Sequence, residues 1–227
     1  MNKPGTSPRL ALFDLDDTLI DLSGAYSWWA AEFAERHRLR ADSISWLNTA
    51  PKVFPGPKDR LLAQAKAQFG LSESVSELWN QYRRRIPELA QARPGVLDGL
   101  ARLRRDGWMV GIVTNGALDN QLGKIRRTGI AEHVDGYVIS GEVGLRKPDP
   151  QIFRLAARQA GAETAEGGWM IGDDPILDIR GGRSTGMSTC WVSHGREWTG
   201  GVLGPDASAQ DTCDAIDTLL ALASVRE

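Results

Sequence analysis

The sequence predicts an α/β protein built on a doubly wound parallel sheet, together with a small all-helical domain. Three observations predict this fold. Short, almost continuously apolar runs recur at residues 10–15, 108–115, 136–140, 168–173 and 188–192, and such runs are typical of strands covered on both faces. Amphipathic segments separate the last four runs, which is the alternation expected of a parallel sheet. The long interval 21–92 contains no strand candidate.

The composition is that of an ordinary globular protein. The 227 residues are 41% hydrophobic and 25% charged, and the formal net charge is −2. Nucleic-acid binding usually requires a strongly basic face, so a nucleic-acid partner is not expected. The two cysteines lack metal-ligand spacing and suit a reducing compartment, and the start of the chain is polar, so we expect a cytoplasmic protein. No run of about 18 apolar residues exists to span a membrane.

The segments between the strands have helical patterns. In 94–107 and 118–129 the apolar residues lie on one face, and each segment ends at a glycine. Segments 148–161 and 173–186 each begin with an aspartate followed by proline, Asp149-Pro150 and Asp174-Pro175. Aspartate is a preferred N-cap and proline a preferred first helical residue.

The interval 21–92 contains three helical faces, at 24–39, 58–70 and 74–86. Ser74 and Glu77 have the spacing of a capping box. We expect Trp28 and Trp29 to belong to the core of this domain. The proline-rich stretch 49–58 is expected to separate two helices, and 92–95 to return the chain to the sheet.

Polar motifs follow three of the predicted strands. They are FDLDDTL (13–19), VTNG (113–116) and GDDPILD (172–178). The carboxyl ends of parallel strands share one edge of a sheet, where ligands bind in open α/β folds. Asp14, Asp16 and Asp173 are therefore expected to lie together, with Asp174 and Asp178 near them.

Such a cluster of carboxylates cannot all ionise unaided. A hard divalent cation relieves the repulsion, and an incomplete shell of carboxylate oxygens suits Mg²⁺. Thr114 adds a hydroxyl donor, and Lys147 of the motif RKPDP (146–150) adds a cation. Together these groups form a receptor for an anion with several oxygens, most simply a phosphoryl group.

The four motifs, in this order, resemble those of the haloacid dehalogenase-like hydrolases, and specifically their phosphatase branch. The resemblance covers nearly the whole chain and includes the stretch DIRGGRSTGM (178–187). It implies a Rossmann-like catalytic core formed by residues 1–20 and 93–227, with a helical cap domain at 21–92.

The resemblance also implies roles for single residues. Asp14 would be the nucleophile that forms an aspartyl-phosphate. Asp16 would be the general acid and base, protonating the leaving group and then activating water. Mg²⁺ would be held by Asp14, the backbone carbonyl of Asp16 and Asp173.

The remaining roles concern the phosphoryl group and its surroundings. Thr114 and the backbone amides of Asn115 and Gly116 would hold phosphoryl oxygens, and Lys147 would neutralise the charge. Asp178 would support the metal or Lys147 without binding substrate, and Asp174 lies beside it. Asp17 and Thr18 are expected to shape the loop.

The expected function is a Mg²⁺-dependent phosphatase acting on a small soluble phosphomonoester, as a monomer or homodimer. Asp16 favours phosphoryl transfer over carbon–halogen cleavage, because 2-haloacid dehalogenases of this family usually lack an aspartate there. A phosphomutase would use the same residues and stays an alternative. A phospho-accepting receiver-type signalling module is a non-enzymatic alternative, although such domains are about half as long and carry the acceptor on a later strand.

Overall fold

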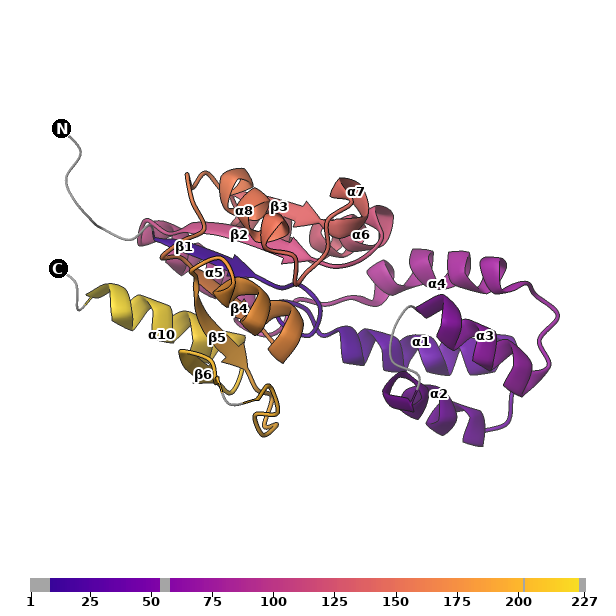
Figure 1. The fold of residues 1–227 in the computed structure, drawn as a ribbon. Helices are drawn as coiled ribbons and strands as arrows, with labels where there is room; N and C mark the ends of the chain where they lie inside the picture. Colours follow the sequence, from indigo (N-terminus) through magenta and orange to yellow (C-terminus); the bar gives the residue numbers. More distant parts are fainter. Residues whose placement is uncertain (1–8, 54–57, 202, 225–227) are drawn as a thin grey trace. The chain divides into compact units, whose positions relative to one another are not determined.

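A six-stranded parallel sheet forms the core of the larger of two compact units (Figure 1). The computed structural model describes residues 9–53, 58–201 and 203–224. The strands lie in the order β3-β2-β1-β4-β5-β6. Their bounds are β1 Leu10–Phe13, β2 Met109–Thr114, β3 Gly136–Ile139, β4 Trp169–Gly172, β5 Ser188–Val192 and β6 Ala207–Ala209.

The sheet order decides which loops can meet. β1 lies between β2 and β4, and every neighbouring pair is parallel. The loops that follow these three strands therefore leave the same edge of the sheet side by side. The predicted doubly wound parallel sheet is confirmed.

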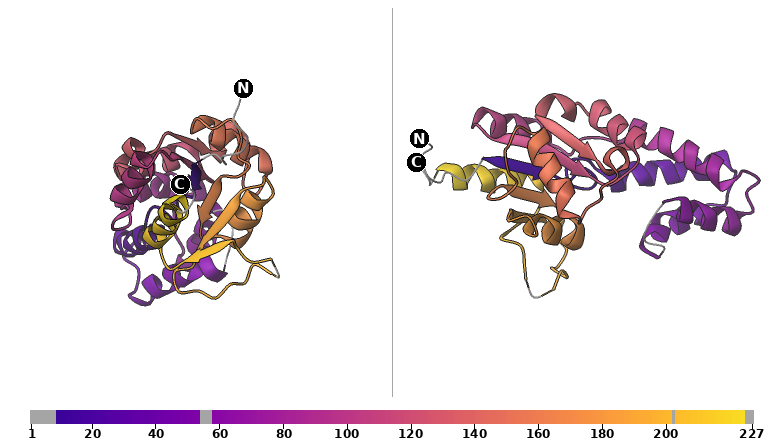
Figure 2. Two further views of the ribbon diagram at one scale, coloured as in Figure 1. Left: turned by 90° about the vertical axis from the view of Figure 1, so that its left-hand side faces the viewer. Right: turned by 45° about the horizontal axis from the view of Figure 1, so that its top comes forward.

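Helices cover both faces of the sheet (Figure 2). On one face α8 packs against β1, β2 and β3, and Leu10 and Leu12 share a buried cluster with Ile152 and Phe153. α5 and α10 pack against each other, and they contact β2 and β5 respectively. The elements of this unit are α5 Val96–Arg105, α6 Leu118–Arg127, η1 Ile130–His133, α7 Ser140–Val143, α8 Pro150–Gln159, η2 Pro175–Arg180, α9 Gly181–Arg183 and α10 Thr212–Ser224.

The chain divides into two compact units. One comprises the residues up to Asp21 and those from Ala92 onward, and the other is Leu22–Gln91. The core unit is closed where the chain leaves and returns: Ile20 and Ala92 form an antiparallel bridge, and the Arg93 N–H donates to the Leu19 carbonyl at 3.0 Å.

The second unit is entirely helical in its described part. Its buried residues include Tyr26, Trp29 and Phe33, which follow helical spacing along one face of its first helix. Trp28 lies off this face and is 67% exposed, so the prediction that it belongs to the core is wrong. The Ser74–Glu77 capping box is confirmed. The helices are α1 Leu22–Arg36, α2 Asp42–Val53, α3 Lys58–Phe69 and α4 Val75–Leu89.

Some elements differ from the sequence prediction. The break expected at 49–58 is wrong for 49–53, because α2 continues to Val53; residues 54–57 lie outside the described part. The segment after Asp174 is a π-helical turn (η2) followed by α9, not one α-helix. Strand β6 and helices α2 and α10 were not predicted. Within the residues described, none of the helices combines the length and the apolar character that crossing a membrane requires.

Candidate active site

The predicted site residues gather at the carboxyl edge of the sheet. Asp14 directly follows β1, Thr114 ends β2, and Asp173 directly follows β4. Lys147 lies in the loop between α7 and α8, and Asp178 lies in η2. Four parts of the sequence that are far from one another thus contribute to one region of the core unit.

Lys147 is the central cation of this region. Its ammonium group donates to Asp14 Oδ1 at 2.5 Å and to Asp178 Oδ1 at 2.7 Å, and all three residues are buried. Burial alone would lower the pKa of Lys147, but the attraction of the two carboxylates outweighs it and raises that pKa. Lys147 therefore stays protonated.

Asp178 is held at both carboxylate oxygens. Its Oδ1 accepts from Lys147, and its Oδ2 accepts from the Asp174 backbone N–H at 3.0 Å. Gly172 makes room for this side chain, since a Cβ at position 172 would lie 2.3 Å from Asp178 Oδ2. The Asp174 carboxylate caps η2 through the N–H groups of Ile176 and Leu177, each at 2.8 Å.

Three carboxylates have the arrangement of a metal-binding set. One oxygen each from Asp14, Asp173 and Asp178 lies within 4.8 Å of the others. Burial, with added repulsion from neighbouring aspartates, raises the pKa of Asp14 and of Asp173 to about 7, although Lys147 and Arg196 respectively oppose this. Lys147 and Arg196 thus do not fully offset the cost of ionising the buried carboxylates, and the hard oxygen donors of the cluster fit a further cation such as Mg²⁺. Asp178, predicted only as a supporting group, thus contributes an oxygen to this set.

The Asp16 carboxylate contacts helix α6. Its Oδ1 and Oδ2 accept from Lys124 Nζ at 2.8 and 3.0 Å, and Oδ2 also accepts from Gln121 Nε2 at 3.1 Å. Gln121 Nε2 also donates to Thr114 Oγ1 at 2.7 Å. Sequence reasoning did not single out Gln121 or Lys124. Polar residues one turn apart on a helix normally indicate a solvated face, yet both are buried here.

The two residues that follow β2, Asn115 and Gly116, have distinct partners. The Asn115 side chain binds the backbone of Lys147, accepting from its N–H at 2.9 Å and donating to its carbonyl at 3.1 Å. The Gly116 N–H, predicted to hold a phosphoryl oxygen, donates to Ser140 Oγ at 3.0 Å. A Cβ at Gly116 would lie 2.7 Å from the Gln121 side chain, so glycine permits the approach of α6.

Residues of β5 and of the loop after it hold Asp173 and the loop after β1. Arg196 Nη2 donates to Asp173 Oδ2 at 3.1 Å and to the Asp173 carbonyl at 3.0 Å, and Trp191 Nε1 donates to the same carbonyl at 3.0 Å. The His194 ring donates to the carbonyl of Asp17, which has a positive φ of 55°. Sequence reasoning missed Arg196, because an arginine in a loop carries no signal of its spatial partner.

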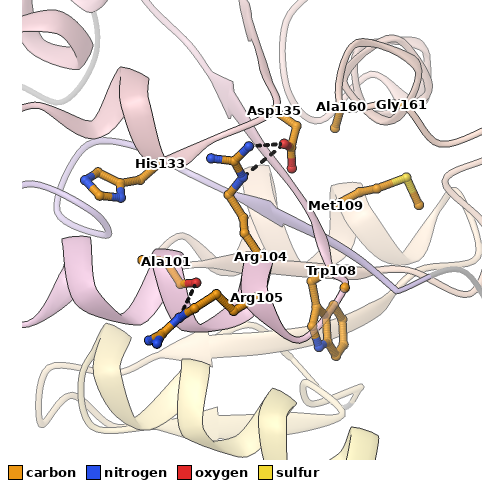
Figure 3. A pocket seen from close by; sticks show the side chains of 10 residues that line it. Ala101, Arg104, Arg105, Trp108, Met109, His133, Asp135, Ala160 and Gly161 are labelled. Atoms are coloured by element: carbon orange, nitrogen blue, oxygen red, sulfur yellow. Dashed lines mark hydrogen bonds and ion pairs between the residues drawn. The ribbon is translucent and has the colours of Figure 1, made fainter.

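A separate hollow of about 720 Å³ lies at the other edge of the sheet (Figure 3). It adjoins Met109, the first residue of β2, whereas Thr114 at the site is the last. Figure 3 shows Arg104 turned toward Asp135, with which it forms an ion pair at 2.8 Å. None of the carboxylates described above lines this hollow.

The sequence model of the family described as haloacid dehalogenase-like hydrolase matches residues 8–186. The chain is a haloacid dehalogenase-like hydrolase. The predicted family membership is confirmed.

This haloacid dehalogenase-like hydrolase is similar to characterised phosphatases. It is 29% identical over 198 residues to a glyceraldehyde 3-phosphate phosphatase of Pyrococcus furiosus, covering 83% of this chain and 82% of that protein. It is 35% identical over 148 residues to a phosphoserine phosphatase of Thermus thermophilus, covering 63% of this chain but only 57% of that protein. Among solved structures, the HAD-hydrolase YfnB of Bacillus subtilis, bound to magnesium, matches 95% of this chain and 100% of its own, with a TM-score of 0.78 and 23% identity. At 23% identity, the similarity to YfnB shows a shared fold.

Proposed function

We propose that this hydrolase is a Mg²⁺-dependent phosphatase that cleaves a small phosphomonoester through an aspartyl-phosphate on Asp14. One observation carries the proposal: the buried Lys147 ammonium group holds the Asp14 carboxylate, and Gln121 Nε2 donates to both Asp16 Oδ2 and Thr114 Oγ1. The phosphatase relatives support the reaction class.

The first step is attack by an Asp14 oxygen on phosphorus, with departure of the alkoxide. Lys147 Nζ lies 2.5 Å from Asp14 Oδ1, so one lysine can offset the charge of both the nucleophile and the arriving phosphoryl group. Asp16 donates its proton to the leaving oxygen and then removes a proton from the water that hydrolyses the aspartyl-phosphate. The Thr114 hydroxyl donates to a phosphoryl oxygen.

Asp14, Asp173 and Asp178 are the carboxylates that would hold Mg²⁺, together with the Asp16 carbonyl. When bound, Mg²⁺ supplies the positive charge that lets an anionic nucleophile approach an anionic substrate.

The helical unit is inserted after the first motif, which is where one class of this family carries its cap. We assign it the selection of the leaving group. A closing helical cap favours small metabolites over phosphoproteins, because closure excludes bulky substrates.

The test is release of inorganic phosphate from p-nitrophenyl phosphate and a panel of metabolite phosphomonoesters, with Mg²⁺ or with EDTA. We expect Mg²⁺-dependent release that Asp14→Asn abolishes. Asp16→Asn should retain more activity on the aryl ester than on alkyl esters, because nitrophenolate leaves without a proton. Asp98→Asn is the matched control, since Asp98 is exposed on α5.

Full activity in Asp14→Asn would contradict the nucleophile. Isomerisation of a sugar phosphate with little phosphate release would favour the phosphomutase, and halide release from a 2-haloacid would favour the dehalogenase. A phosphorylated chain that persists for hours in Mg²⁺ would favour the receiver-type module.

A further inference from the structure

The side chains of Gln121 and Lys124 form a buried polar pair beneath the site. Gln121 is 1% exposed and Lys124 2% exposed, and both project from α6 toward the ends of β1 and β2. Buried polar groups are costly unless every donor and acceptor is used in a defined way. The direction of the hydrogen bonds made by this pair determines whether the Thr114 hydroxyl can donate elsewhere.

Lys124 fixes the orientation of the Gln121 amide. Its Nζ lies 2.7 Å from Gln121 Oε1, and an ammonium group has donors but no acceptor. The atom facing Lys124 must therefore be the amide oxygen. The NH₂ group then points away from Lys124, toward Thr114 Oγ1 at 2.7 Å and Asp16 Oδ2 at 3.1 Å.

The consequence falls on the Thr114 hydroxyl. Because Gln121 Nε2 can only donate, it occupies a lone pair of Thr114 Oγ1, and the hydroxyl proton is left for another acceptor. Gln121 is the partner of this hydroxyl within the residues that the structure describes. A phosphoryl oxygen is the acceptor that the proposed reaction brings to the carboxyl end of β2.

We infer that Gln121, oriented by Lys124, is a positioning residue that forces the Thr114 hydroxyl to act as a donor toward the phosphoryl group. The inference rests on the proposed function. It adds the residue that orients the Thr114 hydroxyl before the phosphoryl group arrives. Gly116 supports the arrangement, because any side chain there would displace Gln121. A fixed donor needs no reorientation when charge develops on the phosphoryl oxygens.

The direct test replaces the hydrogen-bond donor at position 121 with an acceptor. Gln121→Glu keeps the shape of the side chain, and Lys124 can pair with the new carboxylate. The group that faces Thr114 then becomes an acceptor, and the Thr114 hydroxyl donates to it and not to the phosphoryl group. Orthovanadate binding to the Mg²⁺-loaded protein, measured by calorimetry, should weaken about 10- to 100-fold, the range for losing a hydrogen bond to a charged group. Gln121→Met removes the donor without supplying an acceptor, so it should weaken binding by less than Gln121→Glu. Gln159→Glu, at an exposed position of α8, is the charge control.

A double-mutant cycle separates this effect from repulsion between the new carboxylate and Asp16. In a Thr114→Val background there is no hydroxyl to redirect, so Gln121→Glu should then weaken vanadate binding far less than in the native background. A Thr114→Ser background should restore the full effect. Equal losses in the native and Thr114→Val backgrounds, or native vanadate affinity in Gln121→Glu, would overturn the inference.

The inference and the proposed function fail in different ways. Wild-type protein that binds vanadate with the expected coupling but releases no phosphate from any ester would contradict the phosphatase and leave the coupling standing. Wild-type protein that hydrolyses esters while Gln121→Glu behaves as wild type would overturn the inference alone. Absence of both vanadate binding and phosphate release in the wild type would overturn both.

Discussion

The Asn115 side chain binds the backbone of Lys147 at two points: its Oδ1 accepts from the Lys147 N–H at 2.9 Å, and its Nδ2 donates to the Lys147 carbonyl at 3.1 Å. This pair of hydrogen bonds joins the end of β2 to the loop that carries the central lysine. Asn115 was expected to act through its backbone amide, and the structure gives its side chain a separate task. It sets the position of the ammonium group that touches Asp14.

We predict that Asn115→Asp lowers kcat for phosphate release about tenfold or more, because a carboxylate cannot donate to the Lys147 carbonyl and repels it. KM should change less than kcat, since the Asn115 side chain binds the Lys147 backbone and not the substrate. Steady-state kinetics with one aryl phosphate would measure both. Asn80→Asp, on the exposed face of α4, is the control; kinetics of Asn115→Asp matching that control would contradict the role.

Lys147→Met should destabilise the metal-free protein by about 3–5 kcal/mol, because it leaves two buried carboxylates without their cation. Urea unfolding in EDTA would measure the loss. The same change at Arg104, whose ion pair with Asp135 is partly exposed, should cost about 0–1 kcal/mol. Similar losses for the two variants would show that the Lys147 cluster does not hold the core together.

The metal-free protein should lose stability as pH rises from about 4 to about 7. Burial raises the pKa of Asp14 and Asp173 from 3.8 to about 7, so the folded state binds more protons than the unfolded state across this interval. Mg²⁺ replaces those protons, and its stabilising effect on Tm should be larger at pH 8 than at pH 5. Thermal unfolding with EDTA or Mg²⁺ at each pH would test this. Asp173→Asn should flatten the pH dependence in EDTA, whereas Asp98→Asn should not.

Arg196→Gln should tighten Mg²⁺ binding a few-fold. Arg196 donates to Asp173 Oδ2 at 3.1 Å and places a positive charge beside a carboxylate that would hold the cation. The gain is small because the arginine is half exposed and screened. Titration calorimetry with MgCl₂ at low and high salt would measure it. Weaker Mg²⁺ binding in the variant would mean that Arg196 chiefly orients Asp173.

The strands of the core could be predicted because buried parallel strands leave continuous apolar runs in the sequence. Strand β6 escaped prediction since its three residues, Ala207–Ala209, form no such run and depend on β5 for pairing. Helix α2 escaped because Pro51 near its end reads as a breaker, whereas the helix continues two residues past it. Trp28 could not be told from Trp29 by composition; only the packing of α1 decides which of two adjacent tryptophans is buried.

The placement of Asp14 and Asp173 at one edge of the sheet was predictable because each directly follows a strand. The residues that orient the carboxylates of the site were not predictable. Lys124 and Gln121 lie more than 100 positions from Asp16 in the sequence, and nothing local marks their helix face as buried. Arg196 reaches Asp173 from a loop without regular structure, where no periodicity exists to read.

The bridge between Ile20 and Ala92 holds the two ends of the helical insertion next to each other. The chain leaves the core and re-enters it at neighbouring points, so the pairing of β1 with β2 and β4 does not depend on how many residues intervene. The entropy of closing such an excursion grows only slowly with its length. If the helical unit selects the leaving group as proposed, substrate preference and bond-breaking chemistry would be encoded in separate stretches of sequence, and evolution could change the first without changing the second.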